Sequence, residues 1–138
     1  MSLLRWCKTW QGVALIQGLS ATKVLNALAE EEGRPLPAGY YRVEETPQGL
    51  LMAEGSGALS FALIHLAYRF PLATIYEITA TPSLNFFVVL VKRNRKTVQF
   101  VPPPDEATYY PAIHEVMGER TPERILATLG IPKEWFRL

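Results

Sequence analysis

The chain has 138 residues, of which 49% are hydrophobic and 20% are charged. This length is typical of one domain, and this balance excludes a disordered chain, which would lack the apolar surface needed to offset the entropy lost on folding. The longest uncharged runs, Thr9–Thr22 and Ile78–Val91, have 14 residues each and are too short to span a bilayer. We therefore expect residues 1–138 to form one soluble domain that does not bind a membrane.

The charges nearly balance, with 14 basic and 13 acidic residues and a net charge of +1. A whole-molecule field that attracts nucleic acid is therefore not expected, and any electrostatic function must come from a local cluster. Cys7 is the only cysteine and the chain has two histidines, so an intrachain disulfide is excluded and the ligands for a zinc site are too few. We predict no metal and no cofactor, and we expect a cytoplasmic location because no long apolar leader is present.

Amino-acid usage resembles that of heat-adapted proteins. Arginine outnumbers lysine nine to five, glutamate outnumbers aspartate twelve to one, and there are 11 prolines. Heat-adapted proteins carry more proline in their loops and fewer thermolabile residues. We therefore predict a thermophilic or GC-rich source.

The first third of the chain predicts a helix after an N-terminal segment that is either a strand or an irregular arm (residues 3–17). Ser20 is a typical N-cap and Gly33 a typical C-terminal residue of a helix over 21–32. The last residues of this helix, Glu30–Glu32, oppose the helix dipole. Nothing in the sequence explains this conflict.

The remaining elements follow in a recognisable order. A hairpin is indicated by strand patterns at 40–45 and 50–53 around a turn, and a second helix over 58–70 ends before Pro71. Strand patterns follow at 72–80, 86–91 and 97–101, and helix patterns follow at 105–117 and 121–130. The order predicts an α+β domain with a largely antiparallel sheet of about five strands. An N-terminal helix, a central helix and C-terminal helices pack on this sheet.

The strongest local signal is a group of four cations around Asn94, formed by Lys92, Arg93, Arg95 and Lys96. Cations at a hairpin tip can hold phosphates or an acidic partner surface. The alternative is a solvated turn that ends a strand and blocks edge-to-edge aggregation.

A second signal is His65 with Arg69 on the less apolar face of the central helix. The two residues are one helical turn apart, and Glu77 on the following strand could complete an acid/base pair. The alternative is a structural histidine, because proton transfer requires positioned partners that the sequence does not show.

The C-terminal segment, residues 102–138, ends in an aromatic tail that contains Trp135, Phe136 and Leu138. Aromatic side chains supply much of the binding energy at interfaces, although a tail can also fold back on its own core. The sequence leaves both arrangements open.

We interpret the chain as a small non-enzymatic binding or regulatory protein with no recognisable family motif. The hypothesis is that it docks on a larger protein partner, such as a nucleic-acid-handling transcription complex, through the basic turn and the aromatic tail. The first alternative is a small hydrolase or lyase that uses His65, Arg69 and Glu77. The second is direct binding of single-stranded nucleic acid through the basic turn. A homo-oligomer also stays open.

Overall fold

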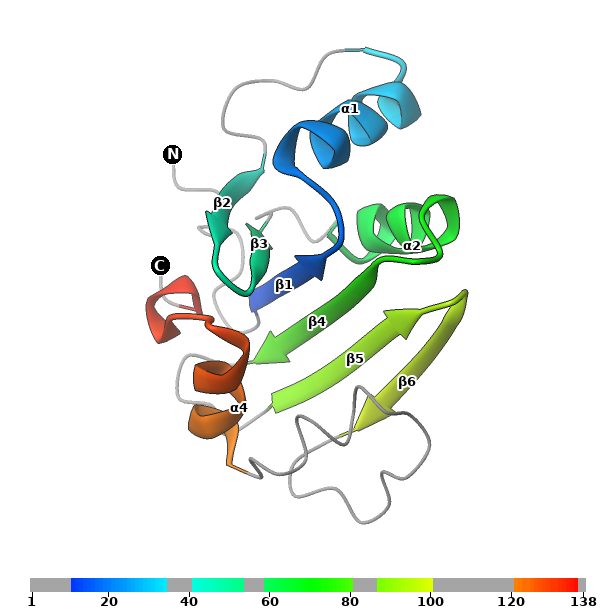
Figure 1. The fold of residues 1–138 in the computed structure, drawn as a ribbon. Helices are drawn as coiled ribbons and strands as arrows, with labels where there is room; N and C mark the ends of the chain where they lie inside the picture. The colour runs from blue at the N-terminus through cyan, green and yellow to red at the C-terminus, as the bar shows by residue number, and fades with distance from the viewer. Residues whose placement is uncertain (1–10, 35–40, 54–58, 81–86, 101–120, 137–138) are drawn as a thin grey trace.

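Six strands form one antiparallel sheet with helices packed on it in the computed structural model (Figure 1). The structure describes residues 11–34, 41–53, 59–80, 87–100 and 121–136. The strands are β1 (Gln11–Gln17), β2 (Arg42–Thr46), β3 (Gly49–Ala53), β4 (Thr74–Ala80), β5 (Phe87–Arg93) and β6 (Lys96–Phe100). The helices are α1 (Ala21–Glu32), α2 (Leu59–Arg69), α4 (Pro122–Leu129) and the 3-10 turn η2 (Lys133–Phe136).

The strand order is β2-β3-β1-β4-β5-β6, and every neighbouring pair is antiparallel. This confirms the predicted α+β class with an antiparallel sheet. The sheet has one strand more than expected. The additional strand is β1, which lies in the segment 3–17 that the sequence predicted to be either a strand or an irregular arm. The helix predicted over 105–117 lies outside the described residues.

Strand β1 lies in the middle of the sheet and is covered on both faces. The side chains of residues 13–16 are fully buried. Val13 and Leu15 point to one core, and Ala14 and Ile16 to the other. A strand buried on both sides needs apolar residues at every position, so it lacks the polar alternation that marks a half-exposed strand.

Helices α1 and α4 begin with the N-caps that the sequence predicts, Ser20 and Thr121. The Ser20 hydroxyl accepts from the Lys23 N–H at 3.1 Å, and the Thr121 hydroxyl accepts from the Arg124 N–H at 3.3 Å. Each bond satisfies one of the free N–H groups of a helix N-terminus. The C-terminal glycines of α1 and α4 are both left-handed, as expected.

Helices α1 and α2 cover one face of the sheet. Helix α1 buries Val24, Ala27 and Leu28, and α2 buries its own apolar face against β1, β3 and β4. The residues of α2 that enter this core are Leu59, Ala62, Leu63 and Leu66.

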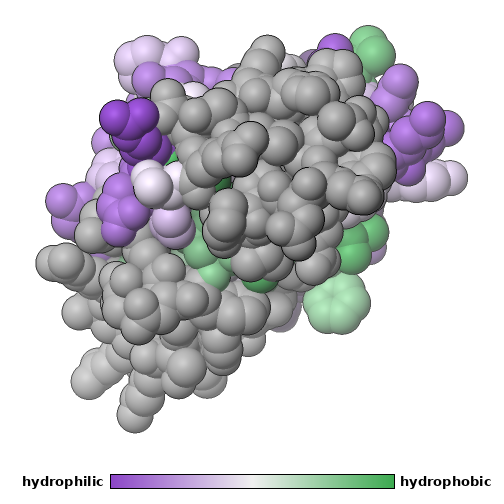
Figure 2. All heavy atoms as spheres, turned by 90° about the horizontal axis from the view of Figure 1, so that it is seen from below, coloured by the Kyte–Doolittle hydropathy of each residue, from purple (hydrophilic) through white to green (hydrophobic). Residues whose placement is uncertain are grey.

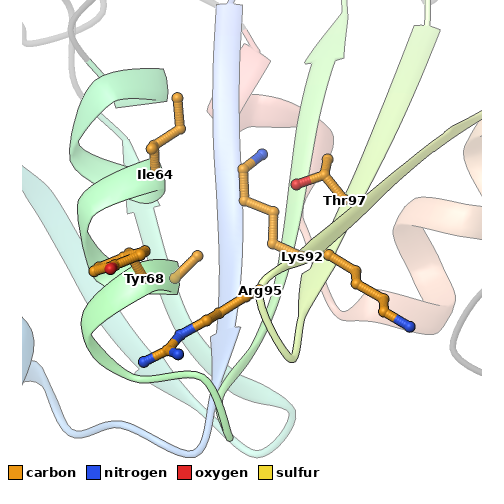
Figure 3. Close-up of a pocket in the computed structure, with 7 residues that line it drawn as sticks. Ile64, Tyr68, Lys92, Arg95 and Thr97 are labelled. Atoms are coloured by element: carbon orange, nitrogen blue, oxygen red, sulfur yellow. The ribbon is translucent and has the colours of Figure 1, made fainter.

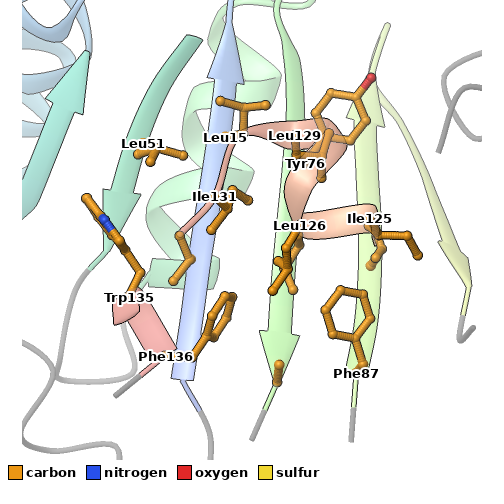
Figure 4. Close-up of a cluster of buried hydrophobic side chains, with 14 of the residues drawn as sticks. Leu15, Leu51, Tyr76, Phe87, Ile125, Leu126, Leu129, Ile131, Trp135 and Phe136 are labelled. Atoms are coloured by element: carbon orange, nitrogen blue, oxygen red, sulfur yellow. The ribbon is translucent and has the colours of Figure 1, made fainter. Parts of the chain in front are cut away.

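Helix α4 and the η2 turn cover the opposite face. Figure 4 shows their side chains over β1, β4 and β5. The residues that these two elements and their connection contribute are Ile125, Leu126, Leu129, Ile131, Trp135 and Phe136. In the residues that the structure describes, the C-terminal segment thus forms the layer that covers this face of the sheet.

Candidate functional site

The basic cluster lies at the two-residue turn that joins β5 to β6. Arg93 pairs with Lys96 in the ladder, and Asn94 and Arg95 form the turn with φ angles of 57° and 61°. Two positive φ angles define the type I′ turn of tight hairpins, in which asparagine and glycine are the usual residues. An arginine in the left-handed region is uncommon and costs about 1 kcal/mol.

Two contacts hold this turn against the C-terminal end of α2, and Figure 3 shows the second of them, between Arg95 and Tyr68. The Asn94 N–H donates to the carbonyl oxygen of Pro71 at 2.9 Å. The Arg95 guanidinium lies over the Tyr68 ring, 5.0 Å from its centroid. The tip is therefore positioned beside the helix, and Arg95 reaches the helix surface.

A shallow hollow of about 130 Å³ lies between α2 and the β5–β6 hairpin, and we call it the basic hollow. Ile64, Ala67 and Tyr68 form an apolar wall, and Arg95 and Lys96 supply cations. Both cations are exposed, and neither forms an ion pair with any residue that the structure describes. Unpaired cations beside an apolar wall suit an anionic group attached to an apolar body.

Lys92 was predicted to be part of the exposed cluster, but the structure buries it. Its ammonium lies 2.7 Å from a Glu77 carboxylate oxygen, and the two side chains are only 5% and 4% exposed. Both residues lie on the α2 side of the sheet, on neighbouring strands, because Lys92 pairs with Ile75 in the ladder and Glu77 is two residues further along the same strand as Ile75. A buried charge needs an opposite charge close by. Lys92 is therefore committed to Glu77, and the exposed cations of the turn are Arg93, Arg95 and Lys96.

Helix α2 carries a second apolar stripe on the side that faces away from the sheet. Phe61, Ile64 and Tyr68 are spaced at i, i+3 and i+7, and they are 77%, 57% and 69% exposed. Leu72, just after the helix, is 89% exposed. Figure 2 shows exposed hydrophobic side chains directly beside hydrophilic ones at one edge of the molecule. We call these four residues the α2 stripe. Several large apolar side chains exposed on one side of a helix are typical of an interaction surface.

His65 and Arg69 face α1 and not the sheet. His65 Nδ1 lies 3.4 Å from a Glu31 oxygen, and Arg69 lies 2.6 Å from a Glu30 oxygen. The Arg69 pair explains in part why carboxylates end α1, because this cation from α2 compensates the unfavourable interaction of Glu30 with the helix dipole. No hydrogen bond or ion pair joins Glu77 to either residue. The structure therefore does not assemble the three side chains of the acid/base alternative.

The aromatic tail folds back on its own domain. Trp135 and Phe136 are 2% and 0% exposed in the core beneath α4, and the Arg42 guanidinium lies 4.0 Å from the centroid of the Trp135 ring. These two side chains are used for packing, so a partner cannot reach them without unfolding η2. Leu138 lies outside the described residues.

A second hollow, of about 310 Å³, lies between the C-terminal end of α1 and the side of α2 that faces it, and we call it the acidic hollow. Glu31 and Glu32 line it together with Tyr41, Phe61 and His65. The Nε2 atom of His65 is buried and has no hydrogen-bond partner among the described residues. The two hollows thus lie on opposite flanks of α2, the acidic one toward α1 and the basic one toward the β5–β6 hairpin.

Within the described ranges, no group of three or more histidine, cysteine, aspartate or glutamate side chains is placed to hold a metal ion. None of the described helices is long and apolar enough to cross a membrane. No protein-family model, curated protein or solved structure matches the chain.

Two features of the site were missed in the sequence, although both leave a signal there. Val88 and Leu90 lie on the same face of β5 as Lys92, and both are apolar and half-buried. Lys92 therefore continues an apolar face of the strand. In α2, Phe61, Ile64 and Tyr68 recur at helical spacing opposite Leu59, Leu63 and Leu66. A helix that is apolar on opposite sides needs a second partner surface.

Proposed function

We propose that this protein is a non-enzymatic binding protein that docks onto a larger protein through the β5–β6 turn and the α2 stripe. The observation that carries the proposal is the juxtaposition of an exposed apolar stripe with Arg95 and Lys96 on one flank of it, two cations that form no ion pair with a described residue. Its partner surface presents carboxylates beside an apolar patch. Such an interface gains affinity from the apolar centre and orientation from the charged rim.

The backbone of the turn supports the same proposal. Arg95 occupies a conformation that favours glycine, and its guanidinium forms no ion pair with any described residue. Backbone strain of this kind tends to persist where it serves a function. Here it places a guanidinium over Tyr68, at the mouth of the basic hollow.

A second candidate, binding of single-stranded nucleic acid, is favoured by one observation. Tyr68 is 69% exposed and lies beside the cationic turn, so it could stack on a base. A phosphate chain that crossed the α2 stripe would meet Glu31 and Glu32 on its other flank. This repulsion, together with the net charge of only +1, makes a protein the better-supported partner.

The test begins with purification of complexes from the native host and identification of the bound protein. The dissociation constant is then measured by calorimetry for the wild type, for Arg95→Glu/Lys96→Glu, and for Lys23→Glu/Arg34→Glu. The control pair makes the same change in net charge on exposed positions of α1 and its end. We expect the turn variant to bind about 10- to 100-fold more weakly and the control to bind within about twofold of the wild type.

A third variant, Ile64→Ser, tests the apolar part of the surface. Because Ile64 is 57% exposed, the substitution should change the free energy of unfolding by less than about 0.5 kcal/mol and still weaken binding. Equal affinities for all variants would show that the partner docks elsewhere. Tight, salt-dependent binding of an oligonucleotide that is lost in Tyr68→Ala would favour the nucleic-acid function.

A further inference from the structure

The two flanks of the α2 stripe carry opposite charge. On the flank toward α1, the acidic hollow presents Glu31 and Glu32. On the flank toward the β5–β6 hairpin, the turn presents Arg95 and Lys96. Glu32, Arg95 and Lys96 form no ion pair with any described residue. The stripe lies between these two charged groups, because the two hollows are lined by opposite sides of the same helix.

A surface with this charge pattern is complementary to a second copy of itself. A two-fold axis that passes near the middle of the stripe, perpendicular to the line joining the two hollows, exchanges its two flanks. Each acidic hollow then meets the cationic turn of the other copy, and the same contact occurs twice. Ile64, between Phe61 and Tyr68 in the stripe, lies close to this axis and meets its own copy.

We infer that two copies of this chain associate through the α2 stripe, with the cationic turn of each copy set into the acidic hollow of the other. The exposed apolar side chains of the stripe would be removed from water. The acidic hollow, of about 310 Å³, has room for an arginine side chain between its carboxylates and the rings of Tyr41 and Phe61. Guanidinium groups bind both carboxylates and aromatic faces.

The contact surface consists of the four apolar side chains of the stripe and a few charged ones, whereas a stable dimer usually buries about 800 Å² on each partner through about 20–30 residues. We therefore expect a small interface. The association should therefore be reversible and weakened by salt, because its charged contacts lie at a solvent-exposed rim. The inference goes beyond the proposed function and does not depend on it. If both hold, the second copy and the larger protein compete for the turn.

Sedimentation velocity over a range of protein concentrations, at low and high salt, measures the association. We expect the wild type to form a dimer that weakens at high salt. Glu32→Arg alone and Arg95→Glu alone should each weaken dimer formation at least about tenfold, because like charges then meet at both symmetric contacts. Arg34→Glu is the control, and it should dimerise like the wild type.

Mixing the two single variants is the decisive step. In a pair made of one Glu32→Arg chain and one Arg95→Glu chain, both contacts again join opposite charges. The mixture should therefore form a one-to-one dimer although neither variant does so alone. Circular dichroism spectra and melting temperatures of both variants establish that they are folded.

Two results would overturn the inference. The first is a wild type that stays monomeric at all concentrations and salt conditions. The second is a dimer that neither variant weakens, or that the mixture fails to restore, because the interface then lies elsewhere. A monomeric protein that still binds the larger partner through its turn would reject the dimer alone and leave the proposed function standing.

Discussion

Replacing Lys92 by methionine is expected to destabilise the domain strongly, although the substitution keeps an unbranched side chain of similar length. Lys92 and Glu77 are 5% and 4% exposed, and their charged atoms lie 2.7 Å apart. Without the ammonium group, the Glu77 carboxylate loses a close opposite charge while it stays buried. Loss of one member of a buried pair costs about 3–5 kcal/mol. This loss is a large part of the free energy of unfolding of a typical domain, which is about 10 kcal/mol.

The double variant Lys92→Met/Glu77→Leu supplies the contrast. Replacement of both charges by apolar side chains of similar volume is often neutral or stabilising. We therefore expect the double variant to be more stable than Lys92→Met by about 3 kcal/mol or more. Its stability should lie within about 1 kcal/mol of the wild type, because neither charge then stays buried without its partner.

Urea denaturation measures these differences, with circular dichroism and tryptophan fluorescence as two independent probes. For Lys92→Met, we expect a lower midpoint with an unchanged slope, and a melting temperature about 10 °C lower. A loss below about 1 kcal/mol would refute the reasoning, since only a solvated pair is worth so little. A double variant as unstable as Lys92→Met would also contradict it.

Three further predictions concern the turn, the tail and two glycines. Arg95→Gly should raise the free energy of unfolding by about 0.5–1 kcal/mol, because glycine relieves the left-handed strain, and should weaken partner binding; urea denaturation and calorimetry measure the two effects. Trp135→Ala and Phe136→Ala should each cost about 3–5 kcal/mol in urea denaturation, since both side chains are fully packed, and a loss below 1 kcal/mol would mean that the tail is undocked. Gly49→Ala should cost about 3 kcal/mol, because a Cβ there would lie 2.7 Å from a backbone oxygen of β1 in a strained conformation. Gly33→Ala meets no atom within 4 Å and should cost only about 1 kcal/mol; equal losses would contradict this difference.

The elements of the fold could be predicted because local signals determine them. Ser20 and Thr121 are caps, and the hydroxyl group of each accepts a hydrogen bond from the first turn of the helix that it precedes. Helix α2 ends before Pro71 because a residue that precedes proline is driven out of the helical conformation. The strands from β2 to β6 also show local patterns. Strand β1 was harder to assign, because its continuous apolar run gives no alternation.

The site was predicted only in part, because its arrangement depends on contacts that are distant in sequence. The turn at Asn94 was found, but its position beside α2 depends on a hydrogen bond to Pro71 and on Tyr68. The pairing of Lys92 with Glu77 depends on strand register. Local sequence does not show whether an aromatic tail docks on its own sheet, so the burial of Trp135 required the structure. The thermophilic source and the cytoplasmic location stay predictions.

Amide hydrogen exchange of the protein, free and in complex with its identified partner, tests the central claim most directly. The surface formed by α2 and the β5–β6 turn is the proposed contact, and a bound partner slows exchange where it excludes water or orders the backbone. We predict increased protection in the peptides that cover residues 61–72 and 93–97, with little change over 122–136. Protection confined to 122–136, or to the β2 edge at Arg42–Thr46, would contradict the account.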